Sequence, residues 1–180
     1  MARPLVIGVA EGGIASLPAE IRDRLAGMDL VVAAPRFRDG LPDGPKTIDW
    51  PSPFSDIFNV LSDNPDKSVA LLTTGDPMWY GAGASLVREL GPDGCEVVPA
   101  VSGLQHAAAR LGWPMAGCRV VSIHGRPVSG LVSALHPRTR LLVIAQDGGS
   151  PMAAAKLLAA RGYGAACICL LYTSDAADES

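Results

Sequence analysis

The sequence has no excess of positive charge. Its 180 residues include 15 Lys and Arg against 18 Asp and Glu, which gives a net charge of −3. No global positive field therefore attracts the chain to nucleic acid or to anionic lipid, and an anionic ligand has to be held by local basic groups. The composition argues against a nucleic-acid partner.

Long apolar runs and a targeting segment are also missing. Apolar runs such as residues 5–9 and 141–145 are far too short to cross a bilayer, and the N-terminus has no signal-peptide core. We therefore expect a cytoplasmic protein with no membrane partner.

Cysteines are few and are not spaced as metal ligands. The four are Cys95, Cys118, Cys167 and Cys169, and no C-x-x-C motif occurs among them. If the last two lay on a strand, they would point to opposite faces. We interpret all four as buried or incidental thiols, and we expect neither a metal site nor a disulfide.

Apolar residues are abundant, at 48% of the chain, and their pattern indicates an α/β fold. Short β-rich runs alternate with stretches of helical period, as in proteins built on a largely parallel sheet. Strands are expected at residues 5–9, 30–34, 69–73, 96–99, 120–123, 141–145 and 166–171. Helices are expected after Pro18, Pro53 and Pro151, and in the segments that hold Leu86 and Leu104. Gly162 fits a left-handed cap at the end of the helix after Pro151.

The strand-helix rhythm breaks at residues 125–139, where Pro127, Gly130 and Pro137 lie close together. We interpret this segment as a crossing between two lobes: an N-terminal α/β lobe over residues 1–124 and a partial C-terminal α/β lobe over residues 125–171. The last nine residues, 172–180, change abruptly to small polar and acidic side chains. We interpret them as a foreign or disordered tail, and the second lobe as truncated.

A glycine-containing turn follows the first expected strand, in residues 8–13 (GVAEGG). Glycine lets the backbone approach a ligand closely, so Gly8 and Glu11 are candidate binding residues. The turn departs from G-x-G-x-x-G at Ala10, and the end of the second strand lacks the acidic residue of a dinucleotide site. An ordinary strand-to-helix turn explains it equally well.

A more specific motif is TTGDPMWYG, at residues 73–81 after an expected strand. Pro77 favours an extended conformation at Asp76, and Gly75 leaves the backbone bare at the carboxyl end of the strand, where open α/β sheets bind ligands. Such a turn can offer amides and one carboxylate to a small polar molecule. The alternative is that Asp76 only caps the following helix.

Two further motifs end expected strands. In PAVSG, residues 99–103, Ser102 can act as a helix N-cap. In SIHGR, residues 122–126, the guanidinium of Arg126 can bind a substrate carboxylate, while His124 can form a hydrogen bond or shuttle a proton. The alternative for Arg126 is a structural salt bridge between the lobes.

These motifs, in this order, resemble the tetrapyrrole methylases, and most of all the C5-methylating domain of the precorrin-6Y methyltransferase branch. The resemblance runs from Pro4 to Leu171. It implies two α/β lobes with the cofactor cleft between them, a homodimer, and S-adenosylmethionine as cofactor. The implied reaction is methylation of carbon 5 of a precorrin-6 or cobalt-precorrin-6 intermediate of cobalamin biosynthesis, with a C15-methylating, decarboxylating domain fused or separate.

The resemblance also assigns residues. It implies cofactor contacts at Gly75, Asp76, Trp79, Ser102, Gly103 and Gln146. For a corrinoid substrate, the candidate contacts are Gly8 and Glu11 of the glycine turn and His124 and Arg126 of SIHGR. Arg36 and Arg38 are further candidates for holding carboxylates, although a solvated loop would explain both.

No catalytic residue is assigned, because methyl transfer is an in-line displacement. Fixing two reactants in place can lower the barrier by about 7–11 kcal/mol, so a dedicated strong base is unnecessary. Two alternatives stay open. One is a methylase of the same fold that acts on a protein side chain or on ribosomal RNA, and the other is a nucleotide-binding module without enzymatic activity.

Overall fold

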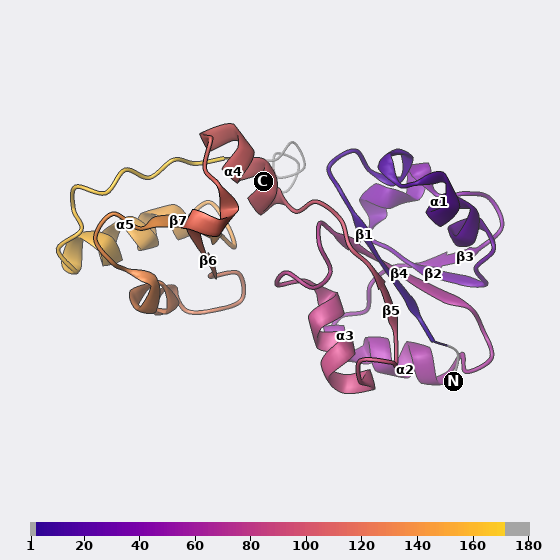
Figure 1. Ribbon diagram of the computed structural model, residues 1–180. Coiled ribbons are helices and arrows are strands. Elements are labelled where there is room, and N and C mark those ends of the chain that lie inside the picture. Colours follow the sequence, from indigo (N-terminus) through magenta and orange to yellow (C-terminus); the bar gives the residue numbers. More distant parts are fainter. Residues whose placement is uncertain (1–2, 172–180) are drawn as a thin grey trace. The chain divides into compact units, whose positions relative to one another are not determined.

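The computed structural model describes residues 3–171, which divide into two compact α/β units (Figure 1). The first unit ends at Ser102 and the second begins at Gly103. The predicted tail, residues 172–180, lies outside the described residues. Within residues 3–171, no helix is both long enough and apolar enough to span a membrane.

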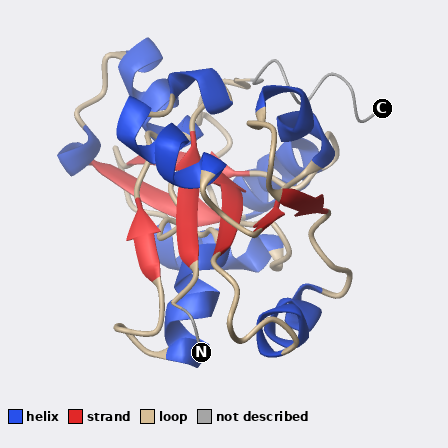
Figure 2. Ribbon diagram, turned by 90° about the vertical axis from the view of Figure 1, so that its right-hand side faces the viewer, coloured by secondary structure: helices blue, strands red, loops and turns tan. Residues whose placement is uncertain are grey.

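The first unit contains a five-stranded parallel sheet in the order β3-β2-β4-β1-β5. Figure 2 shows the strands as a layer with helices above and below it. The elements are, in chain order, β1 (Leu5–Val9), α1 (Ala19–Ala26), β2 (Leu30–Val32), β3 (Lys46–Ile48), α2 (Ile57–Ser62), β4 (Val69–Thr74), α3 (Ala82–Leu90) and β5 (Glu96–Val98). Short 3₁₀ helices lie at Ile14–Ser16, Pro35–Gly40 and Phe54–Asp56.

Successive residues of the central strands pack on opposite faces of this sheet, as the two-residue period of a strand requires. On β1, Ile7 packs with Leu25 of α1, whereas Val6 packs with Leu86 of α3. On β4, Leu72 lies on the α1 face and Leu71 on the face of α2 and α3. Both faces are buried, which explains the continuous apolar runs in the sequence.

The connections reverse direction at β4. The chain passes from β1 to β2 with α1 on one face, and returns from β3 to β4 and on to β5 with α2 and α3 on the other face. This is the arrangement that right-handed crossovers require. The chain therefore leaves β4 toward one face and leaves its neighbours β1 and β2 toward the other. Both sides of β4 are topological switch points, where open α/β sheets bind ligands.

The second unit is built on two parallel strands, β6 (Cys118–Ser122) and β7 (Arg140–Ile144). Helix α4 (Gly103–Leu111) packs Leu104 and Ala108 against Leu142 of β7. On the other face, α5 (Ser150–Ala160) and the 3₁₀ segment Val128–Ala134 pack around Ile123. A further 3₁₀ turn lies at Met115–Gly117. Gly162, just after α5, has the expected left-handed conformation, with φ of 82°.

The division between the units differs from the expected position near residue 125. Because α4 and β6 pack with β7, they belong to the second unit, and the division falls at Ser102. The proline- and glycine-rich segment 125–139 is the crossover between β6 and β7. The local sequence shows that the alternation of strands and helices is interrupted at residues 125–139. It does not show which sheet the neighbouring elements join.

Two strand predictions were wrong. Residues 166–171 form no strand, and their apolar side chains are exposed, Leu170 at 49%. The amide of Ala166 bonds instead to the carbonyl of Tyr163 in a turn, at 2.9 Å. The other error was the omission of β3. It has only three residues, and its pairing with β2 makes it a strand.

We predict that Glu96→Gln lowers the free energy of unfolding by about 0.5 kcal/mol at pH 7. Arg24 of α1 binds the Glu96 carboxylate of β5 through two hydrogen bonds, of 2.7 and 2.9 Å. These bonds lower the pKa of Glu96. The stabilisation is therefore present above the unfolded-state pKa of about 4.3, and is lost as the pH falls through the lower folded-state value.

Urea unfolding at pH 7 and at pH 3, in low and high salt, tests this prediction. The variant and the unmodified chain should differ at pH 7 in low salt, and much less in the other conditions, because both side chains are more than a third exposed and salt screens them. Glu89→Gln, on the exposed face of α3, is the matched control. An equal loss in the control, or a loss that persists at pH 3, would contradict the assignment.

Candidate functional site

The carboxyl ends of three neighbouring strands meet at one edge of the first unit's sheet. β1 lies between β4 and β5, and loops of residues 10–13, 75–81 and 99–102 follow these strands. The sequence motifs GVAEGG, TTGDPMWYG and PAVSG supply these loops. Motifs that are distant in the sequence thus lie side by side on this edge.

Two glycines let the three loops touch. A Cβ on Gly8 would lie 2.5 Å from the carbonyl oxygen of Gly75 and 2.8 Å from Cδ of Pro77. The amide of Gly75 donates to the carbonyl of Val9 at 2.7 Å, and its φ is 64°, which favours glycine. A Cβ on Gly75 would lie 3.3 Å from Cα of Ser102, which is buried. We call Gly8, Gly75 and Ser102 the glycine cradle.

Asp76 stabilises its own loop. Its Oδ1 accepts the amide of Met78 at 2.8 Å, and its carbonyl accepts the amide of Trp79 at 3.2 Å. Helix α3 begins only at Ala82, after Gly81, and has no side-chain cap. The alternative that Asp76 merely caps this helix therefore does not hold, and the half-buried carboxylate orders the loop at the strand end.

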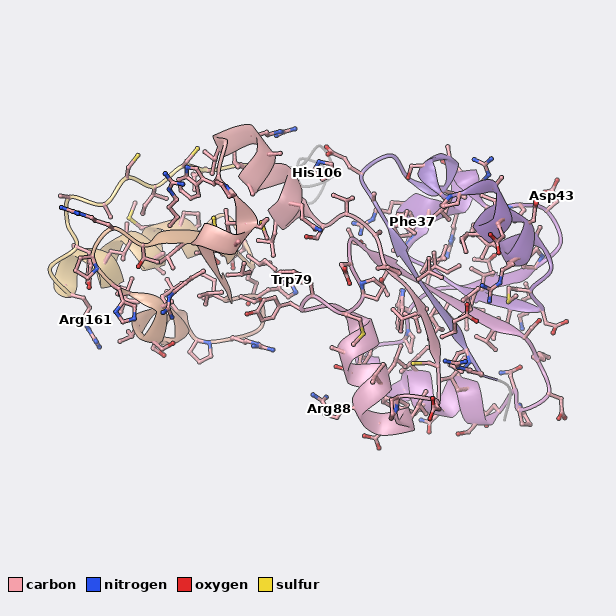
Figure 3. All side chains as sticks on the ribbon, in the orientation of Figure 1. Phe37, Asp43, Trp79, Arg88, His106 and Arg161 are labelled. Carbon is pink, nitrogen blue, oxygen red and sulfur yellow. The ribbon has the colours of Figure 1, made fainter. Side chains whose placement is uncertain are left out.

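The same loop presents large apolar side chains to solvent. Met78, Trp79 and Tyr80 are 47%, 41% and 44% exposed, and Figure 3 shows Trp79 on this loop between β4 and α3. Tyr80 has φ of 59°, a left-handed conformation that costs an aromatic residue free energy. Such strain persists where the surrounding structure fixes it, often beside a ligand site.

The loop after β1 is a tight turn. The amide of Gly13 donates to the carbonyl of Ala10 at 2.9 Å, which leaves Glu11 exposed in the turn. Helix α1 begins at Ala19, several residues later. No long helix therefore starts at these glycines, and the structure supports the simple glycine-turn interpretation of this motif. Gly8 itself lies within β1, opposite Thr73.

The remaining candidates lie in the second unit, at the carboxyl ends of β6 and β7. Oε1 of Gln146 accepts the amide of Gly125 at 3.1 Å, so it holds the loop that carries His124 and Arg126. Both of these side chains are exposed. The structure thus groups His124, Arg126 and Gln146, and it places Gly103 at the first residue of α4.

Asp147 fixes the loop that carries Gln146. Its Oδ1 accepts the amide and the hydroxyl of Ser150, each at 2.9 Å, and the amide of Gly149 at 3.0 Å. The hydrogen bond from the Ser150 hydroxyl, followed by those from the two amides, lowers the pKa of Asp147. A carboxylate at the start of α5 also fits the positive end of the helix dipole.

A hollow of about 390 Å³ lies in the first unit on the other side of β4, at the carboxyl ends of β2, β3 and β4. Its aromatic walls are Phe37, Trp50 and Phe54. The sequence analysis did not find these residues, because it missed β3 and could not place Trp50 and Phe54 at a strand end. The signal was present as two aromatic residues flanking Pro51 and Pro53.

Among residues 3–171, no group of three or more His, Cys, Asp and Glu side chains is arranged to hold a metal ion.

Comparison with known proteins gives consistent matches. The family described as Tetrapyrrole (Corrin/Porphyrin) Methylases matches residues 5–176. The chain is 33% identical over 162 residues to a precorrin-6Y C(5,15)-methyltransferase (decarboxylating) of Sinorhizobium sp., covering 88% of this chain and 39% of that protein. It is 35% identical over 108 residues to a cobalt-precorrin-7 C(5)-methyltransferase of Salmonella typhimurium, covering 60% and 53%.

Solved structures show the same fold. The precorrin-6Y methylase of Archaeoglobus fulgidus matches with a TM-score of 0.59 and 23% identity, over 78% of this chain and 72% of that one. The uroporphyrin III C-methyltransferase of Thermus thermophilus matches with a TM-score of 0.60 and 22% identity, over 89% and 73%. The chain spans about two fifths to one half of the length of the curated relatives above.

We predict that Gly8→Ala destabilises the first unit by about 2 kcal/mol, because the added Cβ forces the loop after β4 away from β1. Gly27→Ala is the control. Its φ is −87°, and a Cβ there would meet its nearest atom at 3.6 Å, an ordinary contact. It should change the stability by less than about 0.5 kcal/mol. Urea unfolding measures both, and equal midpoints would show that the close approach at Gly8 is unimportant.

Proposed function

The chain belongs to the tetrapyrrole methylases, and we propose that it uses S-adenosylmethionine to methylate carbon 5 of a corrinoid precursor in cobalamin biosynthesis. Carbon 5 is the position that the names of both the longer Sinorhizobium relative and the shorter Salmonella relative share. The chain aligns with both, which supports the C5 reaction as the one that this sequence carries. The cobalt-free and the cobalt-containing precursor are both acceptors of this class.

The observation that carries the proposal is the glycine cradle. It lies at the carboxyl edge of a parallel sheet, where the lack of side chains at Gly8 and Gly75 lets the loops after β1, β4 and β5 pack against one another. Amides, carbonyls and the half-buried carboxylate of Asp76 suit a small ligand with amino, carboxyl and ribose groups. We therefore propose that the residues holding S-adenosylmethionine are Gly75, Asp76, Trp79, Ser102, Gly103 and Gln146.

When bound, S-adenosylmethionine supplies an electrophilic methyl group on a sulfonium. The task of the chain is then to align the acceptor carbon and to exclude water, which can lower the barrier by about 7–11 kcal/mol without a strong base. Asp76 contributes by fixing the loop through its bond to Met78. The apolar side chains of Met78, Trp79 and Tyr80 suit the exclusion of water.

For the acceptor we propose Gly8, Glu11, His124 and Arg126 as contacts. Corrinoid precursors carry several carboxylates, and a guanidinium binds a carboxylate through two parallel hydrogen bonds. The exposed Arg126 follows β6 in a loop that the Gln146 side chain anchors at Gly125. His124 can donate a further hydrogen bond.

We also propose that the protein acts in the cytoplasm as a homodimer. The family resemblance supports this state, and light scattering after gel filtration measures it directly. The C15-methylating and decarboxylating reactions named for the Sinorhizobium relative belong to a fused or separate domain in this proposal.

We predict that the chain binds S-adenosylhomocysteine in a calorimetric titration, and binds ATP and NAD at least ten-fold more weakly. Asp76→Ala should weaken S-adenosylhomocysteine binding ten-fold or more, because the loop loses its internal hydrogen bond and the site loses a carboxylate. Ser102→Ala should weaken it less. Asp93→Ala, an exposed carboxylate in the loop before β5, is the control and should leave the affinity unchanged.

Stronger binding of ATP or NAD would favour the nucleotide-binding module and contradict the proposed cofactor. Normal affinity in Asp76→Ala would remove this residue from the site. Mass spectrometry then tests the reaction itself: the acceptor should gain one methyl group in the presence of S-adenosylmethionine.

We predict that Arg126→Ala weakens binding of a carboxylated corrinoid about ten-fold and changes S-adenosylhomocysteine binding by less than two-fold, because its guanidinium is assigned to the acceptor. The matched control is Arg161→Ala, an exposed arginine that follows the end of α5 (Figure 3). Both affinities are measured by calorimetry on variants with unchanged urea midpoints. Equal losses of the two ligands would indicate a structural role for Arg126.

A further inference from the structure

The hollow at the carboxyl ends of β2, β3 and β4 is separate from the glycine cradle. The cradle uses the loops of β1, β4 and β5, whereas the hollow lies at the other switch point, between β2 and β4. Only the loop between β4 and α3 takes part in both, because Gly81 and Ala82 line the hollow. A ligand there would lie beside a bound cofactor without replacing it.

The aromatic walls of the hollow are held in place by contacts with β4 and with neighbouring rings. Nε1 of Trp50 donates to the carbonyl of Leu72 on β4 at 2.9 Å, and the indole stacks on Phe54 with ring centroids 5.7 Å apart. Phe54 in turn meets the edge of Phe58 at 6.4 Å. Phe37, in the 3₁₀ segment that follows β2, is buried in the core on the α1 face of the sheet. The hollow is thus preformed, with flat apolar walls suited to a flat ring.

Charge is found beside the hollow and not within it. None of the lining residues is charged, so the lining has no ionised partner for the amino and carboxyl groups of S-adenosylmethionine. The guanidinium of Arg36 lies 5.0 Å from the centroid of the Phe37 ring. Arg38 is paired with Asp49, whereas Arg36 forms no ion pair with any residue in the described part of the chain.

We propose that this hollow is a subsite for the acceptor, in which one ring of a corrinoid polycarboxylate packs between Phe37, Trp50 and Phe54 while Arg36 binds a carboxylate of that ring. The inference rests on the proposed function and adds the place where the acceptor is held. A volume of about 390 Å³ is at the small end of ligand pockets, which run from about 300 to 1,000 Å³. It suits one ring with its substituents, so the rest of the macrocycle lies outside.

Two substitutions separate the apolar part of the subsite from its charge. Ala82→Leu fills the hollow from the first turn of α3, and its control is Ala26→Leu, the same change at an exposed residue that ends α1. Arg36→Ala removes the cation, and its control is Arg88→Ala in the last turn of α3 (Figure 3). The probes are dicyanocobyrinic acid and its methyl ester, which keeps the ring but not the carboxylates.

Ala82→Leu is expected to weaken binding of both probes at least ten-fold, because the ring is excluded. Arg36→Ala is expected to weaken binding of the acid about ten-fold and of the ester less than two-fold. The two controls and S-adenosylhomocysteine binding should stay within two-fold of the unmodified chain. Urea midpoints check that each variant is folded. Ala34→Leu is a second variant that fills the hollow, and it takes the place of Ala82→Leu if that variant does not fold.

The proposal is overturned if the unmodified chain binds the acid and both filling variants bind it equally well, in which case the proposed function stands without this subsite. It is also overturned if Arg36→Ala affects the acid and the ester equally. If the unmodified chain binds S-adenosylhomocysteine but neither corrinoid probe, the subsite and the proposed acceptor fail together, while the proposed cofactor stands.

Discussion

The loop after β4 lies directly on β1, and this close approach determines the arrangement of the site. It depends on Gly8, because any side chain there would meet the carbonyl of Gly75. The same approach lets the Gly75 amide bond to Val9 and brings Ser102 against the loop. Loops packed together in this way lie at the carboxyl edge of the sheet, where open α/β sheets bind ligands.

Strand β4 supports both binding regions that we propose. Ala70, Leu71 and Leu72 are fully buried between helices on the two faces, so the strand end is rigid. On the β1 side it positions the cradle, and on the β2 side its Leu72 carbonyl anchors Trp50 in the wall of the hollow. Variable loops on a rigid strand end are a common way to build binding sites in α/β proteins. One connection, β4 to α3, couples the proposed cofactor site to the proposed acceptor subsite.

The parts predicted correctly were those with a strong local signal. Residues 5–9 form a strand because both of its faces are buried, and Pro18 and Pro151 mark helix starts. The predicted strand 166–171 had the same apolar character, but the described part of the second sheet gives it no partner. Three-residue β3 shows the reverse case, since pairing makes a strand from a segment with little pattern. Strand formation depends on a neighbour, which local composition cannot supply.

By itself, the sequence determined the α/β class and the strand-end motifs, because glycine, proline and apolar period act on the backbone locally. The family came from the resemblance that those motifs carry. Only the tertiary structure decided which motifs meet. The order of the strands places Gly8 beneath the loop of Asp76, and it brings Phe37, Trp50 and Phe54 together around one hollow. It also distinguished Arg36 from Arg38, because within residues 3–171 only Arg38 has a carboxylate partner, Asp49. Such contacts join residues far apart in the chain, and strand order, which sets them, follows from the packing of the whole sheet.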